Sequence, residues 1–295
     1  MPVRFPDIWL GYKRGHLADW ITQRWVQFTG HSVNLTEQNW LDGPIGNTTK
    51  IGDGFFENYF PANNQRNVGL IEDLGLLRSE VFRPESLSSE IIDFYENTSH
   101  YDLDIWSQWC GVFKPFGWLL NVIFSRRLQQ MNMPISPLDT SKGMTSQVIP
   151  LSTQQGERIG TGWLRKLVST GDIIYVGIYS HCTVPKFSGE CMKIIFPLPN
   201  GSATVVMKPE VGPDGSLFLA SAGNGFGDAG FYLIVRKTSS TAWVKYVKSM
   251  KETIHVYVDN KELRADHVLK LFGATFLRLH YRMRSRKSHN PSETA

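Results

Sequence analysis

Hydrophobic positions follow two different periods along the chain, and the change falls near residue 140. Before it, apolar residues recur every three or four positions, which predicts amphipathic helices at 17–29 and from Pro84 onward. A third segment, 116–131, is apolar nearly all round and is expected to be a buried helix, or one that lies on a membrane surface. A polar loop is expected from His31 to about Gly69. The apolar faces of the first two helices are Leu17, Trp20, Ile21, Trp25 and Phe28, and Leu87, Ile91, Phe94 and Tyr95.

After this point the period changes to two, which predicts β-strands separated by Gly, Pro or Asn-Gly turns. Asn200-Gly201, between two such strands, predicts a hairpin. Residues 243–254 fit helical and strand spacing equally, and 262–284 are predicted to form a final long strand with a kink at Gly273. The other strands are expected at about 144–151, 161–169, 172–184, 190–197, 203–209, 216–221, 230–237 and 253–259.

Together these patterns predict an α+β fold, in which a helical N-terminal half packs on a curved, mostly antiparallel β-sheet. Helix-grip folds and lipocalin-like barrels have this arrangement. The expected divisions are a helical and loop region over 1–80, a helix-plus-sheet domain over 81–284 and a basic, disordered tail over 285–295.

Composition and charge narrow the class of protein. With 295 residues, 41% of them hydrophobic, the chain is globular rather than disordered or fibrous. The net charge of +4 comes from 31 basic and 27 acidic residues, and residues 278–295 hold five of the bases against one acid, which leaves 26 of each elsewhere. The body is therefore neutral, and no nucleic-acid partner is expected.

The cysteines and the amino terminus indicate a cytoplasmic location. Cys110, Cys182 and Cys191 are too few for a disulfide framework. Cys182 and Cys191 could face each other across a hairpin, but reduced, buried thiols are expected. The amino terminus lacks the apolar core of a secretory signal. The longest apolar stretch, 111–124, is shorter than the roughly 20 residues that a membrane span needs.

Two patterns resemble cofactor or metal motifs, but neither meets the structural requirement of its motif. Gly225, Gly227 and Gly230 spell the GxGxxG dinucleotide fingerprint, yet a strand-like segment follows where a helix is needed, so a hairpin turn and no cofactor are expected. His181-Cys182 with Glu190-Cys191 lacks the close cysteine spacing of zinc sites, and no metal is expected.

Side chains that could line a cavity come from several segments. Tyr175 and Tyr179 share one face of the predicted strand 172–184 with His181, and that face is aromatic and able to form hydrogen bonds. An arginine beside an aromatic residue on a strand can hold an anion. Core packing or a solvated sheet face are the alternatives. The candidate ligand-binding residues are Trp106, Trp109, Arg127, Tyr175, Tyr179, Tyr232 and Arg236.

These observations favour a protein that binds a small hydrophobic or amphipathic molecule in an aromatic-lined cavity between sheet and helix. The alternative is a cyclase, isomerase or hydrolase that uses the same cavity for acid–base catalysis. Its candidate catalytic residues are His181, His100, Asp102 and Asp104. Peripheral membrane contact is a less favoured partner, and the oligomeric state is left open.

Five short segments resemble parts of a known group of proteins. They are Phe94-Tyr-Glu-Asn-Thr-Ser, Phe124-Ser-Arg-Arg-Leu-Gln-Gln-Met-Asn-Met-Pro, Pro137-Leu-Asp-Thr, Gly162-Trp-Leu-Arg and Leu277-Arg-Leu-His-Tyr-Arg. They are similar to the carboxyl-terminal region of YndJ-like proteins, a group of uncharacterised bacterial proteins. The resemblance covers about residues 90–284 and implies that this region is one structural unit. It implies no activity and no catalytic residue.

Overall fold

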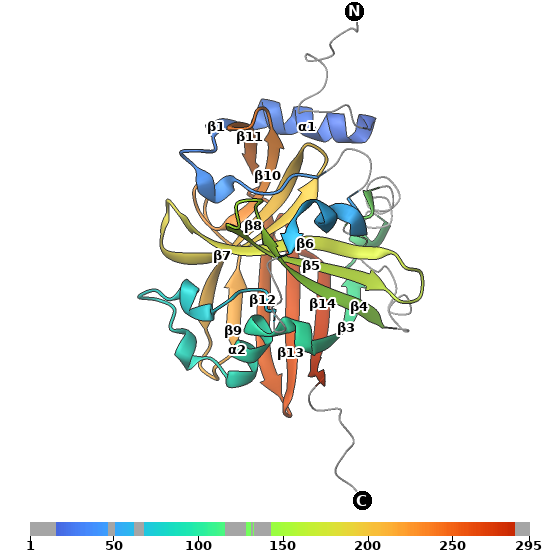
Figure 1. Ribbon diagram of the computed structural model, residues 1–295, viewed down its shortest axis with the longest axis vertical. Helices are drawn as coiled ribbons and strands as arrows, with labels where there is room; N and C mark the ends of the chain where they lie inside the picture. The colour runs from blue at the N-terminus through green and yellow to red at the C-terminus, as the bar shows by residue number, and fades with distance from the viewer. Residues whose placement is uncertain are drawn as a thin grey trace, which may run out of the picture.

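A strongly curved antiparallel sheet forms the body of the protein (Figure 1). The computed structural model describes residues 16–46, 51–61, 68–115, 128–130, 132 and 143–286. The strands follow the order β2-β4-β5-β6-β7-β8-β9-β12-β13-β14-β3, and β3, at one end, approaches β4, next to the other end, so the sheet is a nearly closed barrel. The strands are β1 (His31–Asn34), β2 (Phe60–Pro61), β3 (Tyr101–Trp109), β4 (Met144–Ser152), β5 (Arg158–Leu167), β6 (Ile173–Val184), β7 (Phe187–Leu198), β8 (Gly201–Val211), β9 (Leu217–Ala220), β10 (Gly230–Arg236), β11 (Thr241–Tyr246), β12 (Met250–Asp259), β13 (Glu262–Leu271) and β14 (Ala274–Ser285).

Strand β8 joins the two walls of the barrel. Its first half pairs with β7 and with β10, whereas its second half, from Lys208 onward, pairs with β9. Strands β10, β11 and β1 branch from this point, and helix α1 (Leu17–Thr29) lies across β10 and β11 at the top of Figure 1. One wall is therefore made of β4 to β8, and the opposite wall of β9, β12, β13, β14 and β3.

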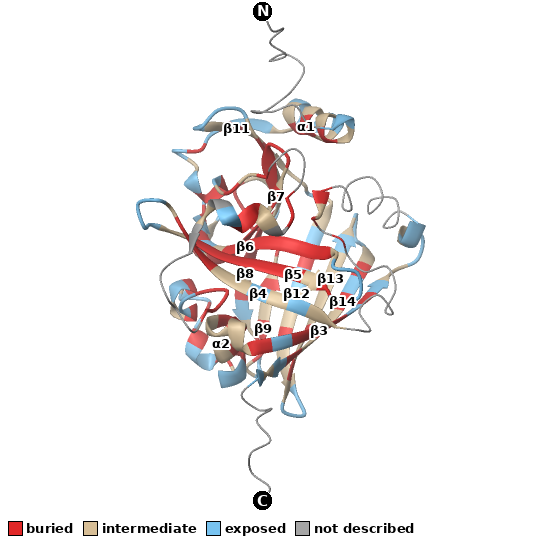
Figure 2. Ribbon diagram, turned by 45° about the vertical axis from the view of Figure 1, so that its right-hand side comes forward, coloured by how far each residue is buried: buried red, intermediate tan, exposed pale blue. Residues whose placement is uncertain are grey.

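The main hydrophobic core fills the space between these walls. Inward side chains of β5 and β6 meet those of β9, β12, β13 and β14, and helix α2 (Ser89–Glu96) adds Ile91, Phe94 and Tyr95 at one end. A second layer, which includes Ile51, Phe55, Phe56 and Leu128, packs on the outer side of β5 and β6. Both faces of these two strands are consequently buried, as the red ribbon of Figure 2 shows.

The predicted helical N-terminal half is wrong. Among the first 140 residues, the α-helices whose bounds the structure describes are α1 and α2; the rest of the described part holds short 3₁₀ turns, β1, β2 and the long strand β3. In β3, Tyr101, Leu103 and Ile105 point into the core and alternate with polar residues, which is a strand period inside a region interpreted as helical. Most of the third predicted helix, 116–131, lies outside the described residues.

Helix α1 has the predicted bounds but not the predicted orientation. Leu17, Ile21, Trp25 and Phe28 are exposed in the described structure, whereas Asp19, Gln23 and Val26 are buried. The polar side docks because it forms hydrogen bonds: the Gln23 amide donates to the carbonyl of Pro199 over 3.0 Å. An amphipathic period alone does not decide which side of a helix faces the protein.

The strand predictions after residue 140 are confirmed in outline, with one error. The segment 262–284 is two strands, β13 and β14, which turn at Phe272 (φ 50°) and Gly273 (φ 84°). The ambiguous segment 243–254 contains the end of β11 and the start of β12. The hairpin at Asn200 (φ 58°) is confirmed, and Cys182 pairs directly with Cys191 across the β6–β7 hairpin.

Candidate functional site

The interior of the barrel contains a cavity of about 90 Å³ between the two walls. Its lining is largely apolar, with aromatic rings from β5, β6, β14 and α2 and aliphatic side chains from β7, β9 and β12. Among the described residues, three side chains that are charged or titrate below the range of tyrosine also reach it: Arg165, Glu252 and His267. A polar group in such a place needs a partner, because burial removes its contact with water.

Arg165 enters the cavity because of its position in β5. Trp163, Arg165 and Leu167 alternate with Leu164, which packs in the outer layer, so the arginine lies on the inward face of the strand. It is paired in register with Tyr175 of β6 and is only 3% exposed.

Three aromatic rings surround the guanidinium. Its central carbon lies 4.3 Å from the ring centroid of Trp163, 4.0 Å from that of Tyr175 and 5.2 Å from that of Tyr281. Cation–π attraction of this kind contributes about 1–2 kcal/mol for each ring when the pair is desolvated. Burial lowers the pKa of Arg165 and the surrounding tyrosines raise it, with an upward net effect, so the group remains charged.

The rings do not satisfy the hydrogen-bonding capacity of the guanidinium. Its Nε and Nη1 atoms are buried without a hydrogen-bond partner, and no described carboxylate forms an ion pair with it, although the Tyr281 hydroxyl interacts with the group. A buried donor without a partner costs about 1–3 kcal/mol. Arg165 is therefore a charged anchor with free donors inside an apolar cavity.

Other polar groups around the cavity are already paired. The hydroxyls of Tyr175 and Tyr179 lie 3.3 Å apart, and Oε2 of Glu252 lies 3.1 Å from Nε2 of His267. Trp163 Nε1 donates to Ser146 Oγ over 2.7 Å. Burial raises the pKa of both tyrosines, so both hydroxyls are neutral at physiological pH.

The site can therefore hold a compact molecule with an acceptor for Arg165 and an apolar remainder. A cavity of about 150 Å³ accommodates benzene, so the space here suits a molecule of only a few non-hydrogen atoms. No group of three or more potential metal ligands occurs among the described residues.

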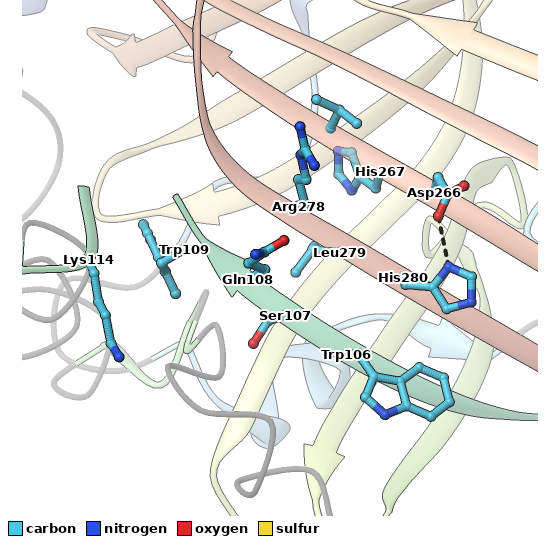
Figure 3. Close-up of a pocket in the computed structure, with 11 residues that line it drawn as sticks. Trp106, Ser107, Gln108, Trp109, Lys114, Asp266, His267, Arg278, Leu279 and His280 are labelled. Atoms are coloured by element: carbon cyan, nitrogen blue, oxygen red, sulfur yellow. Dashed lines mark hydrogen bonds and ion pairs between the residues drawn. The ribbon is translucent and has the colours of Figure 1, made fainter. Parts of the chain in front are cut away.

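The residues predicted for ligand binding do not form one site. Tyr175 and Tyr179 line the barrel cavity, whereas Trp106 and Trp109 line a groove of about 720 Å³ along β3, β13 and β14 (Figure 3). In this groove Nδ1 of His280 lies 2.7 Å from Oδ1 of Asp266. Lys114, Gln108 and Arg278 also line it.

The other candidate ligand residues lie elsewhere. Tyr232 is fully buried in a separate cluster, where its hydroxyl donates to the carbonyl of Asp228 over 2.5 Å. Arg236 forms an ion pair with Asp42 and donates to the carbonyls of Gly43 and Ser239, so its two terminal nitrogens are occupied by the protein, although its Nε is buried without a partner among the described residues. Arg127 is outside the described residues.

The candidate catalytic residues line none of the cavities described here. His181 is partly exposed and lies 3.2 Å from Glu190. Asp102 forms an ion pair with Arg286 at 2.9 Å. Asp104 is held by Arg282 at 2.8 Å and by Arg284 at 3.1 Å. His100 is the last residue of the 3₁₀ turn Thr98–His100, which immediately precedes β3.

Sequence reasoning missed Arg165, Glu252 and His267. A signal was present for the first of these: Trp163 and Leu167 stand two positions on either side of Arg165 and place it on their apolar face. Glu252 and His267 lie in adjacent strands and meet only because β12 pairs with β13.

Comparison with known proteins identifies one relationship. The chain is 33% identical over 241 residues to "Uncharacterized membrane protein YndJ" of Bacillus subtilis (strain 168), which is 79% of this chain. The chain is related to the YndJ-like proteins. The aligned part spans 41% of the length of YndJ. No family model matches the chain, and no solved structure matches it.

The name of YndJ describes that protein as a membrane protein. Within the described residues of the present chain, no helix has both the length and the apolar character needed to cross a bilayer.

Proposed function

We propose that this YndJ relative binds a small hydrophobic or amphipathic molecule in the interior of its barrel. The proposal rests on the aromatic-lined cavity between the two walls, which the buried, charged side chain of Arg165 enters. Ligand sites of this type combine apolar walls with a small number of well-placed polar groups.

The size of the cavity limits both the ligand and its affinity. The best small ligands gain about 1.5 kcal/mol per non-hydrogen atom, so a molecule of about five such atoms gains at most about 7.5 kcal/mol. This corresponds to a dissociation constant in the low micromolar range. Binding between micromolar and millimolar concentrations is therefore expected.

Native mass spectrometry of the freshly purified protein tests the proposal. We expect a bound small molecule, which extraction then identifies. Ala265 lines the cavity and is 4% exposed, so Ala265→Leu fills the space and should abolish the bound mass. Ala274→Leu makes the same change at an exposed position in β14 and should leave the bound mass unchanged.

A clean unliganded mass for all three proteins, together with no binding of small neutral or anionic probes, would refute the proposal. Circular dichroism checks that Ala265→Leu still folds, since overpacking a core costs about 1–3 kcal/mol.

A further inference from the structure

We propose that Arg165 anchors the carboxylate of the ligand, so that the barrel selects a compact aliphatic carboxylate. This inference rests on the proposed function and adds the chemical class of the ligand. Its basis is the guanidinium, which is 97% buried, charged and without hydrogen-bond partners at Nε and Nη1.

The aromatic rings around Arg165 stabilise its charge without accepting its hydrogen bonds. Trp163 and Tyr175 lie over the guanidinium, with centroids 4.3 and 4.0 Å from its central carbon. The N–H groups of a guanidinium project in its own plane, so rings above that plane stabilise the charge but do not accept these hydrogen bonds. An acceptor that lies in the plane of the group is still needed.

The other polar side chains of the cavity determine whether Arg165 already has an anionic partner. Among the described residues, Glu252 is the one acidic side chain that lines it, and its Oε2 lies 3.1 Å from His267 Nε2 rather than against Arg165. Tyr175 and Tyr179 are hydrogen-bonded to each other through their hydroxyls, and the Tyr281 hydroxyl, which interacts with Arg165, is a neutral acceptor. The described residues therefore leave the positive charge of Arg165 without an anionic partner.

The shape of the guanidinium and the apolar lining of the cavity favour a carboxylate over other anions. A carboxylate matches either edge of a guanidinium with two parallel hydrogen bonds, and each edge of Arg165 includes one of the unpaired nitrogens. The rest of the lining is apolar, with Leu70, Ile194 and Val256 among its residues, which favours a ligand with a short hydrocarbon part over inorganic phosphate. The volume of about 90 Å³ excludes long chains.

Titration of the purified protein tests this assignment with propionate, propionamide, inorganic phosphate and octanoate, followed by methyl NMR of cavity residues such as Met283. We expect propionate to bind at least tenfold more tightly than propionamide, which has the same shape without the charge. Phosphate and octanoate should bind at least tenfold more weakly than propionate. In Arg165→Met, propionate should lose at least tenfold in affinity while propionamide changes less than threefold. Arg165→Lys keeps the charge but loses the planar fork of hydrogen-bond donors. Its affinity for propionate should fall between those of the wild type and Arg165→Met.

Each contrary result has a distinct meaning. Equal binding of propionate and propionamide, or unchanged propionate binding in both Arg165 variants, overturns the carboxylate anchor but leaves the barrel as a binding site. Tighter binding of phosphate overturns the choice of a carboxylate, and tighter binding of octanoate overturns the size limit. Failure of all four probes to shift cavity methyl signals contradicts both this inference and the proposed function.

Discussion

Replacing Arg165 by methionine should stabilise the ligand-free protein. The guanidinium is 3% exposed, and its Nε and Nη1 have no hydrogen-bond partner. Two such donors cost about 2–6 kcal/mol together, at about 1–3 kcal/mol each. Methionine fills a similar volume with flexible, apolar atoms and carries no such cost.

The substitution also removes favourable contacts. Trp163 and Tyr175 are the two close cation–π partners of Arg165, and each contributes about 1–2 kcal/mol in a desolvated site. At the midpoints of these ranges the balance is a gain of about 1 kcal/mol, which has the same sign as the gains of about 1–4 kcal/mol seen when buried ion pairs are replaced by apolar residues.

Urea unfolding of the wild type and of Arg165→Met, followed by circular dichroism, measures this difference. Arg282→Met is the matched control, since Arg282 lies on a strand with its Nη2 2.8 Å from Asp104. Loss of that partly exposed pair should lower the free energy of unfolding by up to about 1 kcal/mol. A loss of more than about 2 kcal/mol in Arg165→Met would refute the reasoning, because it would mean that the guanidinium is satisfied in the free protein.

Three further predictions concern the rest of the fold. Burial raises the pKa of Cys182 from 9.0 to about 11. The stability that its neutral thiol contributes is therefore fully present below about pH 9 and is lost as the pH rises to about 11. In urea titrations, the difference in unfolding free energy between the wild type and Cys182→Ala should shrink by up to about 3 kcal/mol over that window. Gly201→Ala places a Cβ 1.8 Å from a backbone carbonyl oxygen of β10 and should cost more than about 2 kcal/mol, whereas Gly225→Ala, with its nearest atom at 3.9 Å, should change the melting temperature little. Ile91→Ala in α2 removes a fully buried side chain and should lower the free energy of unfolding in urea by about 2–5 kcal/mol. Val81→Ala, at a position 61% exposed, is the control, and an equal loss of stability in that variant would contradict the packing described for α2.

The strand pattern predicted the carboxyl-terminal half of the fold well, because alternation is a local property. Tyr175 and Tyr179 were placed correctly on one face of β6. Alternation did not reveal that the opposite face, with Val176 and Ile178, would be covered by segments more than one hundred residues earlier in the chain, such as Ile51. Contacts over such distances depend on topology rather than on period.

The candidate site was only partly predictable for a related reason. A charged residue on a strand usually faces solvent, and Arg165 departs from that rule because its neighbours two positions away are Trp163 and Leu167. Trp106 and Tyr232 were grouped with the cavity by composition, but β3 directs Trp106 outward and Tyr232 belongs to another cluster. Aromatic content indicates buried area without indicating which cavity a ring lines.

A crystal structure of the protein grown in the presence of propionate tests directly whether Arg165 holds a carboxylate inside the barrel. We expect electron density for a carboxylate inside the barrel, with its oxygens about 2.7–2.9 Å from Arg165 nitrogens and its carbon chain against the apolar wall. An empty cavity with the Arg165 guanidinium hydrogen-bonded to Glu252 would contradict it.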